Sequence, residues 1–464
     1  MIMGVAQYRS AYRSGRLDPE TVVADHIAYA KEVQGKVNAI SEINPSAIEE
    51  ARMSARRYAA GAPLGPFDGI PVVVKDSYCV TGMRRWHGSA IHDGDPVSEF
   101  DSEPIARLKE SGAIVIAKTT MPDMGMLASG LSSQFGIVRN PWNTAMSPGG
   151  SSAGAGASLA MGLGAVGLGT DIAGSVRLPA GHCGLAGIKP TQGRIAYSPA
   201  STMRSSGVLG RTVSDVIEGL MVVGRQAGSD PYCLPGSFTP VAFETVLQRM
   251  PRVGILLDMG YGIEPEPQVA AAVVDAAKRL ERAGFDVRSV ALDLTEADFA
   301  NADMVFKAHA VSEIRASRHP DSVLPEVARW CEGAEGISMA DYNDALDGLI
   351  ATVSRIEKAT DGCDFLICPT IPFLGFPAGT PGPGDDRMPL HHTQFTAWFN
   401  QTGQPAAVYR ETQDASTGLP VDVQIVGRRF DDAGVLAVAR YLEGTRGEVP
   451  AFPVIEEEVP DYEL

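Results

Sequence analysis

The chain has 464 residues, of which 56 are acidic and 39 are basic, so its formal net charge is −17. Nucleic acids and anionic membranes are bound by clustered positive charge, and because the sequence contains no run of Lys and Arg we expect neither as a partner. Apolar residues make up 44% and charged residues 20%, which excludes wholesale disorder and supplies a large core.

The cysteines and the uncharged segments indicate a reduced cytoplasmic protein. Six cysteines are scattered without C-x-x-C spacing, and the first residues lack the apolar core of a secretory signal. The stretch 140–170 carries no charge and is long enough to span a membrane. Eight glycines interrupt it, so we predict a helix buried inside a soluble protein instead.

Helices and strands are predicted to alternate along the chain. The segment at about 1–60 is predicted to be helical, with Asp18 as an N-cap and Pro19 at the first helical position. A Pro/Gly loop at 375–386 is the best candidate for a boundary, but apolar strands on both sides indicate a loop within one sheet. We therefore predict one large α/β domain over residues 1–464. The other elements are predicted as strands at 69–76, 113–119, 251–258, 285–294, 364–372 and 420–427, and as helices at 102–112, 269–284 and 431–444.

Two serines follow glycines in the most informative segment, 147–194. Ser151 comes after two glycines and Ser175 after one, and such backbone packs closely around a hydroxyl and points several N–H groups at one spot. A serine nucleophile needs a base, and the segment contains one histidine, His182. Lys75 is an alternative base, because it ends an apolar run where burial would lower its pKa.

The motifs around these residues resemble the amidase signature family. The resemblance spans nearly the whole chain in the family's order. It rests on GGSS (149–152), GTDIAGSVRLPAGHCG (169–184), GIKPTQGR (187–194), GIPVVVKD (69–76), KTTMPDMG (118–125), FGIVRNPWN (135–143), FNQTGQPA (399–406) and GLPVDVQIVG (418–427).

The resemblance implies a mixed central β-sheet covered by helices on both sides and a hydrolase that cleaves a carboxamide. In that family a lysine, a serine preceded by a cis peptide bond and a serine nucleophile act together, and they correspond here to Lys75, Ser151 and Ser175. It further implies an acyl-enzyme on Ser175, proton relay through Ser151 and Lys75, and neither cofactor nor metal.

The resemblance also implies where the substrate is held. The oxyanion hole would consist of the backbone N–H groups of Ile172, Ala173, Gly174 and Ser175. Ile172 and Ala173 replace a hydroxyl residue and a glycine that are common in the family, which changes the shape of the pocket. Met124, Trp398 and Phe399 are the candidates to bind substrate, and with the net charge of −17 they favour an apolar small-molecule amide over an anionic one.

Several other interpretations stay open. One is a glutaminase-type subunit that passes ammonia to a partner for tRNA amidation, and another is a binding protein with a decayed site. A third is an esterase-like α/β-hydrolase, since residues 150–154 match G-x-S-x-G with Ser152 as nucleophile. Asp171 and Arg177 are predicted to form a structural ion pair, His182 and Cys183 to be packed core residues, and the chain is compatible with a homodimer.

Overall fold

One sheet of eleven strands runs through the computed structural model, which describes residues 2–384 and 386–455. The sheet is mixed: β2 pairs in parallel with β3 and β6, and β9 with β10 and β11, whereas the other pairs are antiparallel. A separate hairpin joins β4 (Leu131–Ser132) and β5 (Gly136–Ile137). In spatial order the sheet consists of β1 (Ile40–Ile43), β3 (Ile114–Thr119), β2 (Pro71–Lys75), β6 (Val166–Asp171), β8 (Ser205–Gly210), β7 (Ala186–Lys189), β12 (Ala406–Gln413), β13 (Pro420–Gly427), β11 (Phe365–Cys368), β9 (Arg252–Asp258) and β10 (Asp286–Ala291).

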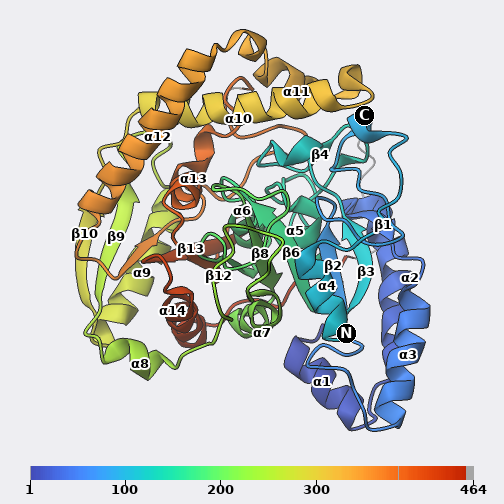
Figure 1. Cartoon of the computed structure of the whole chain (residues 1–464). Helices are drawn as coiled ribbons and strands as arrows, with labels where there is room; N and C mark the ends of the chain where they lie inside the picture. The colour runs from blue at the N-terminus through green and yellow to red at the C-terminus, as the bar shows by residue number, and fades with distance from the viewer. Residues whose placement is uncertain (1, 385, 456–464) are drawn as a thin grey trace.

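Helices cover both faces of this sheet, as the resemblance implied (Figure 1). One face packs against α4 (Glu103–Glu110), α7 (Val213–Val223), α9 (Pro267–Arg282) and α14 (Asp432–Thr445). The other face packs against α5 (Ala153–Ala160), α6 (Arg177–His182) and α13 (Gln394–Gln401). The remaining α-helices are α1 (Val5–Arg13), α2 (Pro19–Val37), α3 (Ala47–Ala59), α8 (Phe243–Leu247), α10 (Glu296–Ala316), α11 (Pro325–Trp330) and α12 (Met339–Ala359).

The N-terminal helices form as their sequence predicts. Asp18 caps α2, its carboxylate accepting the backbone N–H of Thr21 at 3.0 Å, and Pro19 is the first helical residue. The Pro/Gly loop lies within one sheet, as predicted, because β11 before it pairs directly with β13 after it.

The uncharged segment 140–170 differs from its prediction as one buried helix. Only Ala153–Ala160 is helical, and the segment then turns into β6, which lies among the central strands. Gly162 and Gly164 have φ angles of +91° and +73°, a backbone conformation that ends the helix and that glycine adopts readily. No helix in the described part of the chain is long and apolar enough to cross a membrane.

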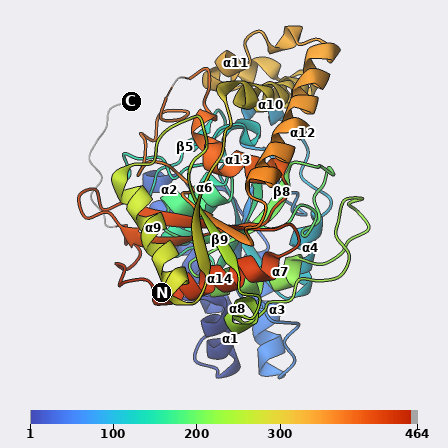
Figure 2. The same cartoon turned by 90° about the vertical axis from the view of Figure 1, so that its left-hand side faces the viewer.

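A helical segment that the sequence analysis did not assign lies between β10 and β11. Its helices α10, α11 and α12 sit together at one end of the molecule in both views (Figures 1 and 2). Two capping boxes begin its long helices, Thr295 with Asp298 and Ser338 with Asp341. These S/T-x-x-D patterns are the sequence signal that marks the two helix starts.

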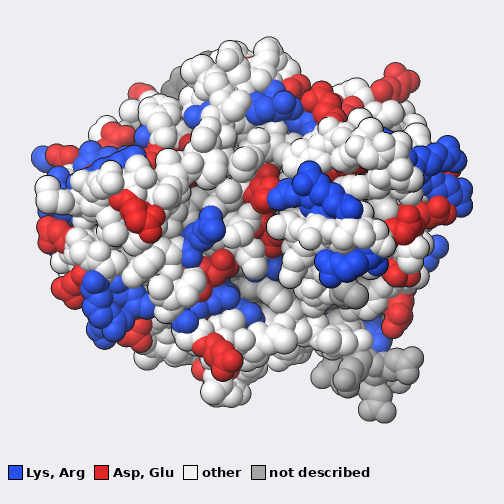
Figure 3. Space-filling model, turned by 90° about the horizontal axis from the view of Figure 1, so that it is seen from below, with Lys and Arg blue, Asp and Glu red and all other residues white. Residues whose placement is uncertain are grey.

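Acidic and basic side chains are interspersed on the surface. On the face seen from below, groups of both signs alternate with uncharged areas and no continuous basic stripe crosses the view (Figure 3). That face therefore does not offer the clustered positive charge that binding to nucleic acid requires.

Candidate active site

Lys75 ends the central strand β2 and is completely buried. Its Nζ lies 2.7 Å from the Oγ of Ser151 and 2.9 Å from the Oγ1 of Thr170, and it also donates to the Thr170 carbonyl at 3.3 Å. Burial lowers the pKa of Lys75 to about 7, the negative charge of Asp171 opposes the shift, and the positive charge of Arg204 adds to it. Near neutral pH the amine is therefore available in its neutral form to accept a proton from Ser151.

Ser151 and Ser175 line the same pocket although 23 residues lie between them in the sequence. Ser151 precedes α5, and the peptide bond from Gly150 to Ser151 is cis, as the resemblance implied. Ser175 lies in the loop that joins β6 to α6. The Ser152 N–H donates to the Ser175 carbonyl at 3.0 Å, and this contact holds the two serine segments together.

A buried ion pair holds the loop that carries Ser175. Asp171 at the end of β6 binds the Arg177 guanidinium with oxygen–nitrogen distances of 2.8 and 3.1 Å, which confirms the predicted pair. Burial alone would raise the pKa of the Asp171 carboxyl, but the Arg177 charge holds it well below its usual range. The same carboxylate accepts the N–H groups of Gly174 at 2.8 Å and Val176 at 3.0 Å. Asp171 thus fixes the backbone on both sides of Ser175.

The contacts of Asp171 bear on the oxyanion hole that the resemblance implied. The N–H of Gly174 donates to the Asp171 carboxylate at 2.8 Å and is therefore already satisfied within the protein. Within the described residues, the N–H groups of Ile172, Ala173 and Ser175 make no hydrogen bond to the protein. The Asp171 carboxylate thus takes up the N–H groups three and five residues further along its own loop and leaves these three without a protein acceptor.

Residues from the C-terminal part of the chain complete the support of this loop, and the sequence analysis gave them no role. Arg177 also donates to the Thr396 carbonyl at 3.0 Å, to Gln424 Oε1 at 2.9 Å and to Asn400 Oδ1 at 2.6 Å. Asn400 in turn donates to the Asp171 carbonyl at 3.0 Å. Asn400 and Gln424 lie in the C-terminal motifs of the family, FNQTGQPA and GLPVDVQIVG, and this position in a motif was the available signal.

Gly174 cannot be replaced without disturbing that support. Its φ is +116°, which side chains other than hydrogen rarely allow, and a Cβ there would lie 2.3 Å from the Oγ1 of Thr396. Thr396 uses the same oxygen to donate to the Ala173 carbonyl at 2.6 Å. The glycine therefore lets α13 approach the loop that carries Ser175 directly.

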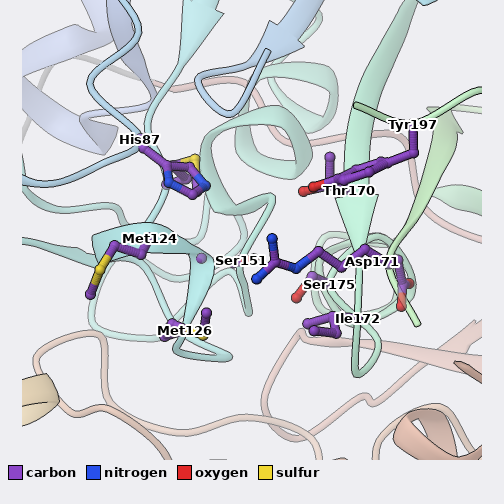
Figure 4. A pocket seen from close by; sticks show the side chains of 12 residues that line it. His87, Met124, Met126, Ser151, Thr170, Asp171, Ile172, Ser175 and Tyr197 are labelled. Atoms are coloured by element: carbon purple, nitrogen blue, oxygen red, sulfur yellow. The ribbon is translucent and has the colours of Figure 1, made fainter. Parts of the chain in front are cut away.

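The pocket has an apolar wall and a polar wall. The side chains of Met124, Met126 and Ile172 lie at the left and bottom of the view in Figure 4, and Tyr197 and Thr170 lie at the upper right. The structure thus places Met124 in the pocket.

Trp398 and Phe399 do not line this pocket. Both are buried in the core, and the indole N–H of Trp398 donates to the Tyr261 hydroxyl at 2.9 Å. Both lie on α13, which packs behind the loop that carries Ser175, and this position gives no support to the expectation that they contact substrate.

One group of side chains beside the pocket has the composition of a metal site. Among the described residues, His87, His92 and Glu313 place one ligand atom each within 4.8 Å of one another. The Nδ1 of His87 and the Nε2 of His92 lie 2.5 and 3.4 Å from the same Glu313 oxygen, and the Nδ1 of His92 lies 3.0 Å from Asp95. These contacts are hydrogen bonds. Burial lowers the pKa of His87, and the positive charge of Arg85 lowers it further. The arrangement favours a hydrogen-bonded bridge between α10 and the loop of His87 over a cation site.

Three further candidates from the segment 147–194, which are Ser152, His182 and Cys183, do not line the pocket. Ser152 is completely buried as the N-cap of α5, with its Oγ 3.5 Å from the Thr170 carbonyl. His182 and Cys183 are packed in the core, as predicted, and burial lowers the pKa of His182 to about 4 and raises that of the Cys183 thiol well above its usual range. His182 therefore lies away from the two serines, whereas Lys75 contacts Ser151 directly.

Comparison with known proteins gives one family. The family model described as Amidase matches residues 21–436. One subunit of the glutamyl-tRNA(Gln) amidotransferase of Synechococcus sp. (strain CC9311) is 31% identical over 95% of this chain and 96% of that relative. Among solved structures, one described as an amidase is 27% identical with a TM-score of 0.82, over 96% of this chain and 100% of that one. The structure of 6-aminohexanoate cyclic dimer hydrolase is 28% identical with a TM-score of 0.83, over 95% and 96% of the two chains.

Proposed function

Because the chain belongs to the amidase signature family, we propose that it hydrolyses a carboxamide through an acyl-enzyme on Ser175. The observation that carries the proposal is the contact of 2.7 Å between Lys75 Nζ and Ser151 Oγ, in a pocket that Ser175 also lines. A serine hydroxyl becomes a nucleophile when a neighbouring base accepts its proton, and a lysine can do so only when its pKa is lowered.

The first half of the reaction transfers the acyl group. Neutral Lys75 accepts the proton of Ser151, Ser151 accepts that of Ser175, and the Oγ of Ser175 bonds to the carbonyl carbon. The free N–H groups of Ile172 and Ala173 and that of Ser175 itself support a role in stabilising the oxyanion. Loss of one such donor typically costs about 2.7–4 kcal/mol of transition-state stabilisation. The proton then passes through Ser151 to the nitrogen as the C–N bond breaks and the amine or ammonia leaves.

The second half of the reaction regenerates the enzyme. A water molecule gives its proton to the same relay and attacks the acyl carbon, and the bond to Ser175 breaks. The products are a carboxylic acid and an amine, so the sum of both halves is hydrolysis of one amide bond. The same residues act as base in the first step of each half and as acid in the second.

A fluorophosphonate probe tests the assignment of the nucleophile. We expect peptide mapping to place the adduct of the wild-type protein on Ser175, with no labelling in Ser175→Ala. Ser152→Ala is the matched control and should be labelled like the wild type, because Ser152 is buried away from the pocket. An adduct on Ser152, or full labelling of Lys75→Ala at neutral pH, would refute the mechanism.

A second candidate function is that of a glutaminase subunit, which the likeness to the amidotransferase component over 95% of the chain favours. Such a subunit would release ammonia from glutamine only with its partner present. The isolated protein should therefore be assayed against primary amides, anilides, ureas and glutamine. Turnover of simple amides by the isolated chain supports the amidase, whereas activity confined to glutamine and dependent on a partner supports the glutaminase.

A further inference from the structure

The polar wall of the pocket contains an arginine, Arg204, that neither the sequence motifs nor the mechanism uses. It directly precedes β8, and its backbone is held on both sides. Its N–H donates to Ser201 Oγ at 3.0 Å, and its carbonyl accepts the side-chain amide of Gln192 at 2.8 Å. Gln192 also donates to the Ser201 carbonyl at 2.7 Å, so one side chain fixes the short turn that presents Arg204.

The guanidinium of Arg204 forms no ion pair with any carboxylate in residues 2–384 and 386–455. The one carboxylate that lines the pocket, Asp171, is paired with Arg177, and Glu313 behind His87 binds the two histidines. The Arg204 side chain forms a hydrogen bond with the Tyr197 hydroxyl. This hydroxyl is neutral, so it does not balance the positive charge of the guanidinium. Its positive charge acts inside the site, since it contributes to the lowered pKa of Lys75. A partly buried guanidinium beside catalytic groups is normally paired, because an unpaired charge is costly to desolvate.

The same pocket is also lined by the apolar side chains of Met124, Met126 and Ile172. We infer that Arg204 is the carboxylate-binding group of the substrate pocket, so that the preferred substrates are amides that carry a carboxylate on a short apolar spacer. A guanidinium binds a carboxylate with two parallel hydrogen bonds. These bonds set the orientation of the carboxylate, and the opposite charges neutralise each other. That the bound carboxylate belongs to a substrate rests on the proposed function. That Arg204 binds a carboxylate does not.

The net charge of −17 does not oppose this inference. Charges separated by more than about 8 Å are largely screened at physiological ionic strength, so the surface carboxylates act weakly in the pocket. The guanidinium of Arg204 acts on a ligand in the pocket at short range and in a less polar medium. The preference for apolar over anionic substrates that the total charge indicated is therefore revised by the local charge of Arg204.

The test compares pairs of substrates with the same spacer, in which one member carries a carboxylate and the other a neutral amide in its place. Succinamate and succinamide have the same spacer, and one ends in a carboxylate where the other ends in a neutral amide. A second pair, N-acetylglycine and N-acetylglycinamide, places the charge on the leaving-group side, so the two pairs distinguish on which side of the scissile bond the carboxylate binds. For the wild type we expect kcat/KM to favour the charged member of one pair by roughly 10- to 100-fold.

The variants Arg204→Met and Arg204→Lys are compared by this ratio and not by absolute activity, because removing the cation also changes the pKa of Lys75. Arg204→Met should bring the ratio to within about threefold of one, and Arg204→Lys should keep part of it, since a lysine retains the charge but not the paired geometry. Arg56→Met, which removes an exposed positive charge from α3, is the matched control and should keep the wild-type ratio. A wild type that does not favour the charged member of either pair, or an unchanged ratio in Arg204→Met, would overturn the inference.

Calorimetric titration separates this inference from the proposed function. The Ser175→Ala protein is titrated with all four compounds, and so is its double variant with Arg204→Met. Tighter binding of a charged compound that the double variant loses supports the carboxylate site even if the wild type hydrolyses no amide. Equal binding of the charged and neutral compounds would refute it even if the wild type is an active amidase.

Discussion

The base of the proposed mechanism makes a quantitative prediction about pH. The pKa of Lys75 is lowered from 10.5 to about 7, so about half of the molecules hold a neutral amine at pH 7. At the unperturbed value the neutral fraction at pH 7 would be only about one in 3,000. Because activity requires the neutral form, kcat/KM should be fully developed above the pKa and lost as the pH falls through about 7. The loss should approach tenfold per pH unit below about pH 6.

Two other buried groups titrate in the same range and must be separated from Lys75. The pKa of Lys189 is lowered to about 7 and that of Asp422 is raised to about 7, in both cases chiefly by burial, and neither residue lines the pocket. The assay is therefore the profile of kcat/KM between about pH 3.5 and 10.5 for the wild type, Lys189→Met and Asp422→Asn, with Lys75→Ala as the inactive reference. We expect the midpoint to stay near 7 in the first three proteins.

A different midpoint would identify a different base. Burial lowers the pKa of His87, which also lines the pocket, to about 4, so a profile that falls only near pH 4 would point to that histidine. A midpoint near 10 would mean that Lys75 is not desolvated. Either result, or a midpoint that moves away in Lys189→Met, would refute the reasoning that connects the burial of Lys75 to its role as base.

Three further predictions concern the same loop and its neighbours. Lys75→Met should abolish turnover and raise the free energy of unfolding at pH 7 by at least about 1 kcal/mol, because burial disfavours the charged form that the lysine has in the unfolded chain; a chemical denaturation curve that shows a less stable variant would contradict this. Asp171→Asn should lower the free energy of unfolding by about 3–5 kcal/mol and reduce kcat, since it leaves the Arg177 charge buried without its partner, and near-wild-type stability would show that the pair does not hold the loop. Gly174→Ala should cost about 1–3 kcal/mol of stability and lower kcat, because its Cβ would meet Thr396, and unchanged kinetics would mean that α13 can shift without effect.

The sequence predicted which polar side chains meet in the pocket better than it predicted the residues that line its walls. Lys75, Ser151 and Ser175 were identifiable because glycines and a strand end surround them in a specific order, and the structure brings Lys75 and Ser151 into contact and places Ser175 in the same pocket. The commitment of the Gly174 N–H to Asp171 was not predictable, because it depends on the direction of one side chain within a loop. Arg204 was missed for the same reason: nothing in its local sequence says that it lines the pocket rather than the surface.

The fold was predicted where the apolar pattern is unambiguous. Short apolar runs such as the strand ending at Lys75 and the capped helix that begins after Asp18 match the structure. The segment 140–170 was assigned as one helix because small residues fit both a buried helix and a close-packed strand, and only the neighbouring strands β2 and β8 select the strand at Val166–Asp171. Helices α10 and α12 were missed, although a capping box marks the start of each, and α10 lacks a strong apolar face.

The strand order has a consequence for synthesis on the ribosome. β12 and β13 are the last strands of the chain, yet they lie in the middle of the sheet, between β7 and β11. A nascent chain that ends before Ala406 therefore has two partial sheets with open edges at β7 and β11, the kind of edge that invites pairing with other chains. Arg177 would also lack Gln424, one of its acceptors. Ser175 is made long before Gln424, so nascent chains that lack β13 carry Ser175 without the full network that supports its loop.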